Sequence, residues 1–335
     1  MEAQSTKAEE IDAVVTWVDG SDPVHRAKRE AIMEAVGRSP ARQGLIPAGK
    51  NPIRFSDNGE LRWCLYSIRK FAPWIRHIHL VTDNQVPDFL TPSVRAALGV
   101  SIVDHHEIFR DYESVQPTFN PYAIETVLWR IEGLSEKFIF FNDDFVLLQS
   151  VNPGDFFRGD DVVLRGAWQR IRGASVAHRV CHSALNSILF RTFGISRTMQ
   201  LHAQMNGAKH AGYHKQHFRS PHVPHPLRRE TFEKHFQDHP NLLKQNLSLP
   251  FRGHADFVPV SLANHLEIQY GRPQFIVCRD NSMFSGENAS VHTVDAIISH
   301  IQSGACFLCL QSLDAFREEA RTHIRNNLDQ HIFGV

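Results

Sequence analysis

Short apolar segments alternate with amphipathic ones along the first half of the chain. Residues 11–18 form a valine-rich run that ends at Asp19 and Gly20, which is typical of a buried strand followed by a turn. Five apolar residues at helical spacing then predict a helix with one apolar face: Leu61, Cys64, Leu65, Ile68 and Phe71. Asp57 and Glu60 precede this face at the spacing of a capping box, with Asp in place of Ser or Thr. The pattern therefore predicts a strand and then a capped helix.

Strand and helix patterns continue to alternate as far as residue 141. Strands are predicted at residues 77–81, 100–103 and 138–141, and helices at residues 92–98 and 121–132. This alternation is typical of a mostly parallel sheet that is covered by helices on both faces. We therefore predict an α/β, Rossmann-like fold.

The second half of the chain is less regular. Residues 160–250 are rich in His and Arg and are interpreted as a helical, loop-rich insertion or cap over the sheet. Strand character returns at residues 274–278, and residues 291–301 predict an amphipathic helix. The chain is thus divided into a flexible tail (1–10), an α/β half (11–159), a helical cap or acceptor region (160–250) and a returning α/β segment (251–335).

Acidic residues follow several of the predicted strands: Asp19, Asp83, Asp143 and Asp144. Two adjacent carboxylates at the mouth of a buried strand repel each other and lose hydration unless a positive charge compensates. A cation held together with phosphate is one explanation, because Mg²⁺ takes one or two carboxylates and fills its shell with water and phosphate oxygens. A solvated turn is the other, since Asn and Asp favour turns. Ligands bind beyond the carboxyl ends of strands in such sheets, and this coincidence favours the cation.

Composition sets outer limits on the class of protein. The 335 residues are 42% hydrophobic and 21% charged, as in globular proteins, and the formal net charge of zero provides no overall field to attract nucleic acid. No apolar run approaches the length of a membrane-spanning helix, and the polar first ten residues lack the apolar stretch of a signal peptide. The five cysteines lack paired spacings apart from Cys306 and Cys309, which suggests free thiols. We therefore expect a cytoplasmic protein.

Four blocks of sequence carry a resemblance to a known family. They are IDAVVTWVDGSD at residues 11–22; a long block at residues 54–155 that contains RFSDNGELRWCLYSIRKFAPWIRHIHLVTDNQVP and PTFNPYAIETVLWRIEGLSEKFIFFNDD; PHVPH at residues 221–225, followed by Phe251-Arg252 and Asp256; and CRDN at residues 278–281. In this order they resemble the Stealth family of sugar-1-phosphate transferases, which includes bacterial capsule polymerases and the catalytic subunit of N-acetylglucosamine-1-phosphotransferase. The last block departs from the family pattern, because Arg279 stands where Asn is usual, and the role of residue 279 is left open.

The resemblance implies a nucleotide-sugar fold of the GT-A type and a transfer of hexose-1-phosphate from a UDP-sugar to a glycan hydroxyl. The implied donor is UDP-N-acetylglucosamine, with UMP as the leaving group. The implied cofactor is Mg²⁺ or Mn²⁺, held by Asp143, Asp144 and Asp280. The implied catalytic residues are His222 as general base, Arg252 as a stabiliser of transition-state charge, Glu125 as the base or its orienter, and Asp144. The implied substrate-binding residues are Asp19, Arg54, Asp57, Arg62 and Asn281. Peripheral association with a capsule export complex at the membrane would be compatible with this activity, although no sequence pattern indicates it.

Each of these assignments has a simpler alternative. Glu125 can be an exposed helix charge, His222 one of 21 histidines, and Arg252 a surface salt bridge. Asp19 can serve only the turn with Gly20, and capping or surface pairing can explain Arg54, Asp57 and Arg62.

Three functions remain open from the sequence. The first is the transfer of hexose-1-phosphate in capsular or exopolysaccharide synthesis. The second is an ordinary glycosyltransferase that transfers sugar alone and releases UDP, although Asn142-Asp143-Asp144 is not the Asp-x-Asp motif that would favour it. The third is a zinc protein, which the His-rich run at residues 210–225 suggests, but the run lacks the regular ligand spacings of known zinc sites.

Overall fold

The structure is a computed structural model and describes residues 10–37, 58–171, 200–277 and 282–335. A central sheet of five strands has the order β3-β2-β1-β4-β9. Its strands are β1 (Ile11–Thr16), β2 (Ile78–Thr82), β3 (Val100–Asp104), β4 (Lys137–Asn142) and β9 (His225–Arg228). The first four are parallel, and β9 pairs antiparallel with β4. The predicted α/β, Rossmann-like fold with a mostly parallel sheet is confirmed.

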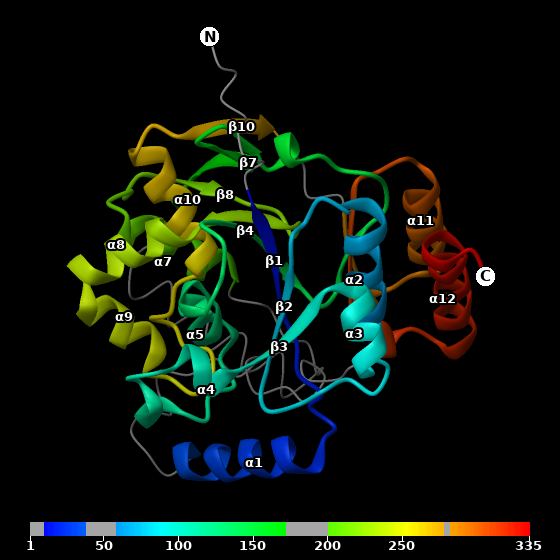
Figure 1. The fold of residues 1–335 in the computed structure, drawn as a ribbon, viewed down its shortest axis with the longest axis horizontal. Coiled ribbons are helices and arrows are strands. Elements are labelled where there is room, and N and C mark those ends of the chain that lie inside the picture. Colours follow the sequence, from blue (N-terminus) through cyan, green and yellow to red (C-terminus); the bar gives the residue numbers. More distant parts are fainter. Residues whose placement is uncertain (1–9, 38–57, 172–199, 278–281) are drawn as a thin grey trace.

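Strand β1 lies at the centre of this sheet and is buried on both faces. Val15 belongs to one core cluster, together with residues of helix α2 (Glu60–Phe71). Val14 faces the opposite way and belongs to a second cluster, which includes residues of α5 (Pro121–Thr126) and α10 (Pro259–Gln269). Figure 1 shows α2 and α3 (Pro92–Leu98) on one side of the strands and α5, α7 (Gln200–His210) and α10 on the other. Successive side chains of a strand point to opposite faces, so this apolar run supplies both cores.

Two predicted helices begin or end differently from expectation. Helix α2 starts at Glu60 after Gly59, whose φ is 88°, and the Glu60 carboxylate accepts a hydrogen bond from the Asn58 amide. Glu60 is therefore the first helical residue and not the third residue of a capping box, while Asp57 lies outside the described residues. Helix α5 ends at Thr126, and only a 3₁₀ turn (Leu128–Arg130) follows where the prediction continued to residue 132. The Tyr122 carbonyl accepts from the side chains of Thr126 and Asn246, a tertiary contact that sequence periodicity does not reveal.

Residues 160–250 contain three strands that the sequence pattern did not predict. They are β7 (Asp161–Arg170), β8 (Gln216–Arg219) and β9. Strand β7 forms a second sheet with β6 (Phe157–Arg158), β8 and β10 (Pro273–Val277), whereas β9 extends the central sheet. The helical and loop-rich interpretation of this segment therefore missed these strands, because short strands containing polar residues are stabilised by partners distant in sequence. The segment also contains α7, α8 (Arg229–Asp238) and α9 (Pro240–Leu247).

The C-terminal residues build a third layer beside α2. Strands β11 (Met283–Ser285), β12 (Phe307–Gln311) and β5 (Phe145–Leu147) form a small sheet, and helices α11 (Val291–Gln302) and α12 (Glu318–Phe333) lie next to α2 in Figure 1. Trp63 of α2 joins their core, and its indole N–H donates to Asp329 of α12 at 2.7 Å. The remaining α-helices of the described residues are α1 (Pro23–Gly37) and the single turn α4 (His105–Ile108). Within the described residues, no helix combines the length and apolar character needed to span a membrane.

Candidate active site

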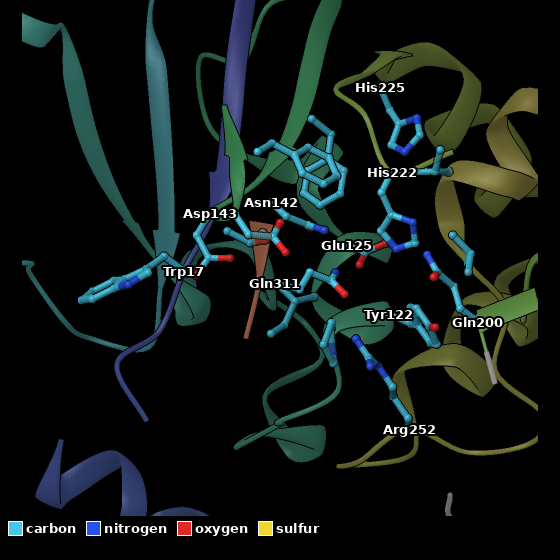
Figure 2. Close-up of a pocket in the computed structure, with 18 of the residues that line it drawn as sticks. Trp17, Tyr122, Glu125, Asn142, Asp143, Gln200, His222, His225, Arg252 and Gln311 are labelled. Carbon is cyan, nitrogen blue, oxygen red and sulfur yellow. The ribbon is translucent and has the colours of Figure 1, made fainter. Parts of the chain in front are cut away.

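A cavity of about 860 Å³ lies at the carboxyl edge of the central sheet. Residues from β1, α5, the turn after β4, the segment before β9, and the loop before α10 line its wall. Five residues proposed from the sequence meet in it: Glu125, Asp143, Asp144, His222 and Arg252. Figure 2 shows four of them, Glu125, Asp143, His222 and Arg252, around one space. Strands β1 and β4 are neighbours, so their carboxyl ends open onto the same edge of the sheet.

The turn between β4 and β5 carries the two acidic residues. Burial raises the pKa of the Asp144 carboxyl to about 6. Hydrogen bonds from Gln311 and Cys309 favour the charged form and partly oppose this rise. The Oδ1 atom of Asp144 is buried and has no hydrogen-bond partner among the described residues. A buried carboxylate oxygen without a donor is costly, and either a proton or a cation relieves that cost.

The residues present fit a magnesium-type cation better than a closed protein cage. Asp143 and Asp144 both line the cavity and offer hard oxygen atoms, and Mg²⁺ binds one or two carboxylates while keeping water or phosphate as its other ligands. Within the described ranges, no group of three or more His, Cys, Asp or Glu side chains could hold a metal ion by itself. Asp280, the third predicted ligand, lies outside the described residues.

Glu125 stands on α5 and lines the cavity. Burial raises the pKa of its carboxyl to about 8, and the nearby Arg252 guanidinium opposes this shift. Asn120 caps the helix, because its side-chain oxygen accepts from the Tyr122 amide. Glu125 is therefore not the exposed helix charge that the sequence alone would favour, and its pKa lies close to neutral pH.

Arg252 lies in a loop that is fastened to the start of α5. The buried carboxylate of Asp256 accepts from the Gly253 amide at 2.7 Å and from the Asn120 side chain at 2.8 Å. The guanidinium carbon of Arg252 lies 5.0 Å from the centre of the Tyr122 ring. Asn120 thus links the helix that carries Glu125 to the loop that carries Arg252, and fixes both relative to the cavity.

His222 lies in the short segment between β8 and β9. The backbone of Ser220, two residues earlier, makes two hydrogen bonds with the side chain of Gln204 on α7. The Ser220 hydroxyl accepts a third hydrogen bond from the side chain of Asn264 on α10. In Figure 2 the His222 ring points toward Glu125. His225 lines the same wall, and burial, with contributions from His222 and Arg165, lowers the pKa of His225 to about 3. His225 is therefore neutral at physiological pH.

The other predicted substrate residues do not all reach this cavity. Asp19 lies in the loop after β1, where its carboxylate accepts from the backbone and hydroxyl of Ser21, and it is not among the lining residues. Arg62 is exposed on α2, and its guanidinium lies 4.6 Å from the centre of the Phe333 ring, also outside the lining. Four further residues of the prediction or its pattern fall outside the described ranges: Arg54, Asp57, Arg279 and Asn281.

Several lining residues were not proposed as site residues from the sequence. The cavity extends toward α1 and α4, where Trp17, His25, His105 and Phe119 form its wall. Burial lowers the pKa of both histidines, to about 4 for His105, so this part of the cavity carries neutral rings. Trp17 follows strand β1 directly, a position that could have identified it. Gln311 had no such signal, because it is far from the other site residues in sequence.

The sheet order and the position of the cavity define an α/β protein whose ligand site lies at the carboxyl edge of a parallel sheet. Two family models match the chain: Stealth protein CR1, conserved region 1, over residues 9–37, and Stealth protein CR2, conserved region 2, over residues 54–164. The exopolysaccharide phosphotransferase cps2G of Lactiplantibacillus plantarum is 32% identical over 261 residues, which cover 74% of this chain and 72% of the relative. The chain belongs to the Stealth family.

Other relatives match smaller parts of longer proteins. The exopolysaccharide phosphotransferase SCO2592 of Streptomyces coelicolor is 32% identical over 76% of this chain, and the chain spans only 25% of the length of that relative. The receptor polysaccharide phosphotransferase WefC of Streptococcus oralis is 40% identical over 45% of this chain and 42% of the relative.

Solved structures of glycosyltransferases give weak structural matches. The galactosyltransferase LgtC, in complex with donor and acceptor sugar analogs, is 10% identical and aligns over 94% of this chain and 95% of its own, with a TM-score of 0.41. At that score the likeness supports no conclusion about this chain, and its fold class follows from its own strand order.

Proposed function

We propose that this chain transfers hexose-1-phosphate from a nucleotide-sugar to a glycan hydroxyl during synthesis of an exopolysaccharide or capsule. The donor is a UDP-sugar, with UDP-N-acetylglucosamine as the first choice, and UMP is the leaving group. The observation that carries this proposal is the meeting of Asp143, Asp144, Arg252, Glu125 and His222 in one cavity. The names of the curated relatives, which are exopolysaccharide, capsular and receptor polysaccharide phosphotransferases, support the same chemistry.

The reaction breaks the phosphoanhydride bond of the donor and leaves the bond between sugar and phosphate intact. The acceptor oxygen forms a new bond to the phosphorus that carries the sugar. The bridging oxygen leaves with UMP and keeps the electron pair of the broken bond, while the proton of the acceptor hydroxyl passes to a base of the enzyme. Such a transfer depends mainly on positioning and on neutralising phosphate charge, so a cavity rich in fixed polar groups suits it.

Glu125 and His222 are the two candidates for the base. Glu125 has a pKa of about 8, which makes its carboxylate a stronger base than an exposed glutamate. The His222 ring points toward Glu125 in Figure 2, so one group can accept the proton while the other orients it. We assign the pair jointly to proton removal from the acceptor hydroxyl.

Arg252 stabilises negative charge on the transferring phosphate. A guanidinium presents several N–H donors in one plane and matches phosphate oxygens in a bidentate manner. Its buried Nε atom has no hydrogen-bond partner among the described residues, so a donor remains for a ligand. The Asp256 carboxylate holds the loop of Arg252 but does not line the cavity.

Asp143 and Asp144 are the residues that would hold Mg²⁺ or Mn²⁺. When bound, the cation would neutralise charge on the diphosphate of the donor. The zinc alternative receives no support from the described part of the chain, because the required ligand groups do not come together there. We place the reaction in the cytoplasm, where activated sugar nucleotides are available.

The fate of the donor phosphate tests this function directly. The purified protein is incubated with UDP-N-acetylglucosamine carrying ³²P in the phosphate next to the sugar, Mg²⁺ and candidate glycan acceptors. Label in the glycan together with unlabelled UMP is expected for sugar-1-phosphate transfer. Label in released UDP would instead establish the alternative, an ordinary glycosyltransferase. A reaction with the Glu125→Gln protein controls for label that a contaminating enzyme releases.

A further inference from the structure

Strand β12, near the C-terminus, lies against the acidic turn of the site. It pairs antiparallel with β5, the strand that follows the turn, with Cys309 opposite Phe145 and Leu308 opposite Val146. The pairing continues into the turn, because the Leu310 amide donates to the Asp144 carbonyl at 3.1 Å. Residues 307–311 lie outside both stretches that the family models match.

Two side chains of β12 hydrogen-bond the Asp144 carboxylate. The Cys309 thiol donates to Oδ2, with 3.6 Å between sulfur and oxygen, and the Gln311 side chain provides a second hydrogen bond. The two residues are two positions apart on one strand, so their side chains leave the same face of the sheet. Gln311 lines the cavity, whereas Cys309 is fully buried behind it.

A second buried thiol holds the start of the same turn. Cys64 of α2 donates to the carbonyl of Asn142, again with 3.6 Å between sulfur and oxygen. Hydrogen bonds from α2 and β12 therefore hold the two ends of the turn, at Asn142 and Asp144 respectively. Because both thiols are completely buried, water cannot replace either contact without a change in packing.

We propose that Cys309, together with Gln311, is a positioning residue that fixes the Asp144 carboxylate for a divalent cation. This inference rests on the proposed function, since it gives Asp144 a ligand role in the phosphate transfer. A hydrogen bond to Oδ2 sets the rotation of the carboxylate and leaves Oδ1, which lacks a protein partner, for the cation. Groups that orient a metal ligand typically change metal affinity by about 10- to 100-fold when removed.

The experiment measures Mn²⁺ binding by calorimetry without substrate, and separately measures KM, kcat and thermal unfolding. Cys309→Ala should weaken Mn²⁺ binding by about 10-fold and lower kcat, because the carboxylate loses its donor. Cys309→Ser should recover most of the affinity, since a hydroxyl can also donate. Cys306→Ala is the matched control: its partly buried thiol accepts from Gln149, and its removal should leave Mn²⁺ affinity unchanged.

Gln311→Ala provides a second variant in case Cys309→Ala does not fold, and it should also weaken Mn²⁺ binding. Wild-type affinity in Cys309→Ala, or in Gln311→Ala if only that variant folds, would overturn the positioning role and leave the proposed function untouched. Failure of Cys309→Ser to recover affinity would likewise reduce Cys309 to a packing residue. Absence of Mn²⁺ binding to the wild-type protein would overturn the positioning role, whereas the fate of the labelled donor phosphate would still decide the proposed function.

Discussion

Arg252 opposes the effect of burial on Glu125 but does not cancel it. The guanidinium favours the charged carboxylate, yet desolvation dominates and the pKa of Glu125 reaches about 8. A group with this pKa is largely protonated at neutral pH and becomes a carboxylate only in a slightly alkaline solution or when a ligand changes its surroundings. The balance between these two residues therefore determines how the site responds to pH.

The first prediction concerns stability against pH. The pKa of Glu125 is raised in the folded protein from an ordinary value of 4.5, so its favourable contribution is complete below that value and is lost as pH rises to about 8. Glu125→Gln imitates the protonated form and removes this dependence. Urea unfolding at about pH 5 and about pH 9 should show the variant gaining stability relative to wild type at the higher pH. The exposed Glu132→Gln protein should follow wild type at both values.

The second prediction concerns the rate of transfer against pH. If Glu125 contributes to proton removal, kcat/KM should rise as pH approaches about 8, because only the carboxylate can accept the proton. Glu125→Gln should abolish transfer across the whole range. A variant that retained a wild-type pH profile would exclude Glu125 from proton removal and leave His222 as the base.

The third prediction concerns the two remaining reactive groups. Asp144→Asn and His222→Ala should each abolish transfer and leave the far-ultraviolet circular dichroism spectrum and the unfolding temperature close to wild type. Asp160→Asn is a matched control for the first change, because the Asp160 side chain is exposed and does not line the cavity. Near-normal turnover in either site variant would remove that residue from its assigned role.

The fourth prediction concerns the geometry of the positively charged side chain at position 252. Arg252→Lys should reduce kcat by about 100-fold, the effect typical of losing one donor to developing charge, because an ammonium group cannot reproduce a bidentate contact. Steady-state kinetics with the labelled donor measures the loss. Arg110→Lys changes an exposed guanidinium in the same way and should retain full activity. Equal rates for the two variants would show that Arg252 does not contact the reacting phosphate.

The fifth prediction concerns the stability of the fold at a residue outside the cavity. Asp12 is fully buried at the amino end of β1, away from the cavity, and its carboxylate accepts from Arg76, His79 and the Ser135 amide. Burial alone would raise the pKa of Asp12, but these hydrogen bonds hold that pKa well below its usual range. Its contribution to stability is therefore present above the unfolded pKa and is lost as pH falls.

Asp12→Asn should lower the free energy of unfolding at neutral pH by about 3 kcal/mol, because it breaks a buried charged pair. Denaturant unfolding at neutral and acidic pH measures this loss, which should shrink as the solution becomes acidic. Glu10→Gln, which removes the exposed second carboxylate on Arg76, should have little effect. A similar loss in both variants would contradict the role assigned to Asp12.

Local sequence patterns predicted the elements that depend on neighbouring residues. Helix α3 has the predicted bounds, and β1, β2, β3 and β4 each lie within two residues of expectation. Among the strands that the sequence did not predict, β7, β8 and β9 depend on partners far along the chain: β9, for example, pairs Leu227 with Phe138. Helix α5 ended early for the same reason, since Asn246 contacts its final turn from another helix.

The sequence by itself determined that Asp143 and Asp144 follow a buried strand, because an apolar run and a polar turn are properties of adjacent residues. Through the resemblance it also indicated Glu125, His222 and Arg252, but not what surrounds them. Only the tertiary structure decided that these residues share one cavity and that Arg62 does not reach it. It also decided the pKa of Glu125 and the contact of Cys309 with Asp144. Burial and contacts across more than a hundred residues arise only when the layers pack, so no local pattern can encode them.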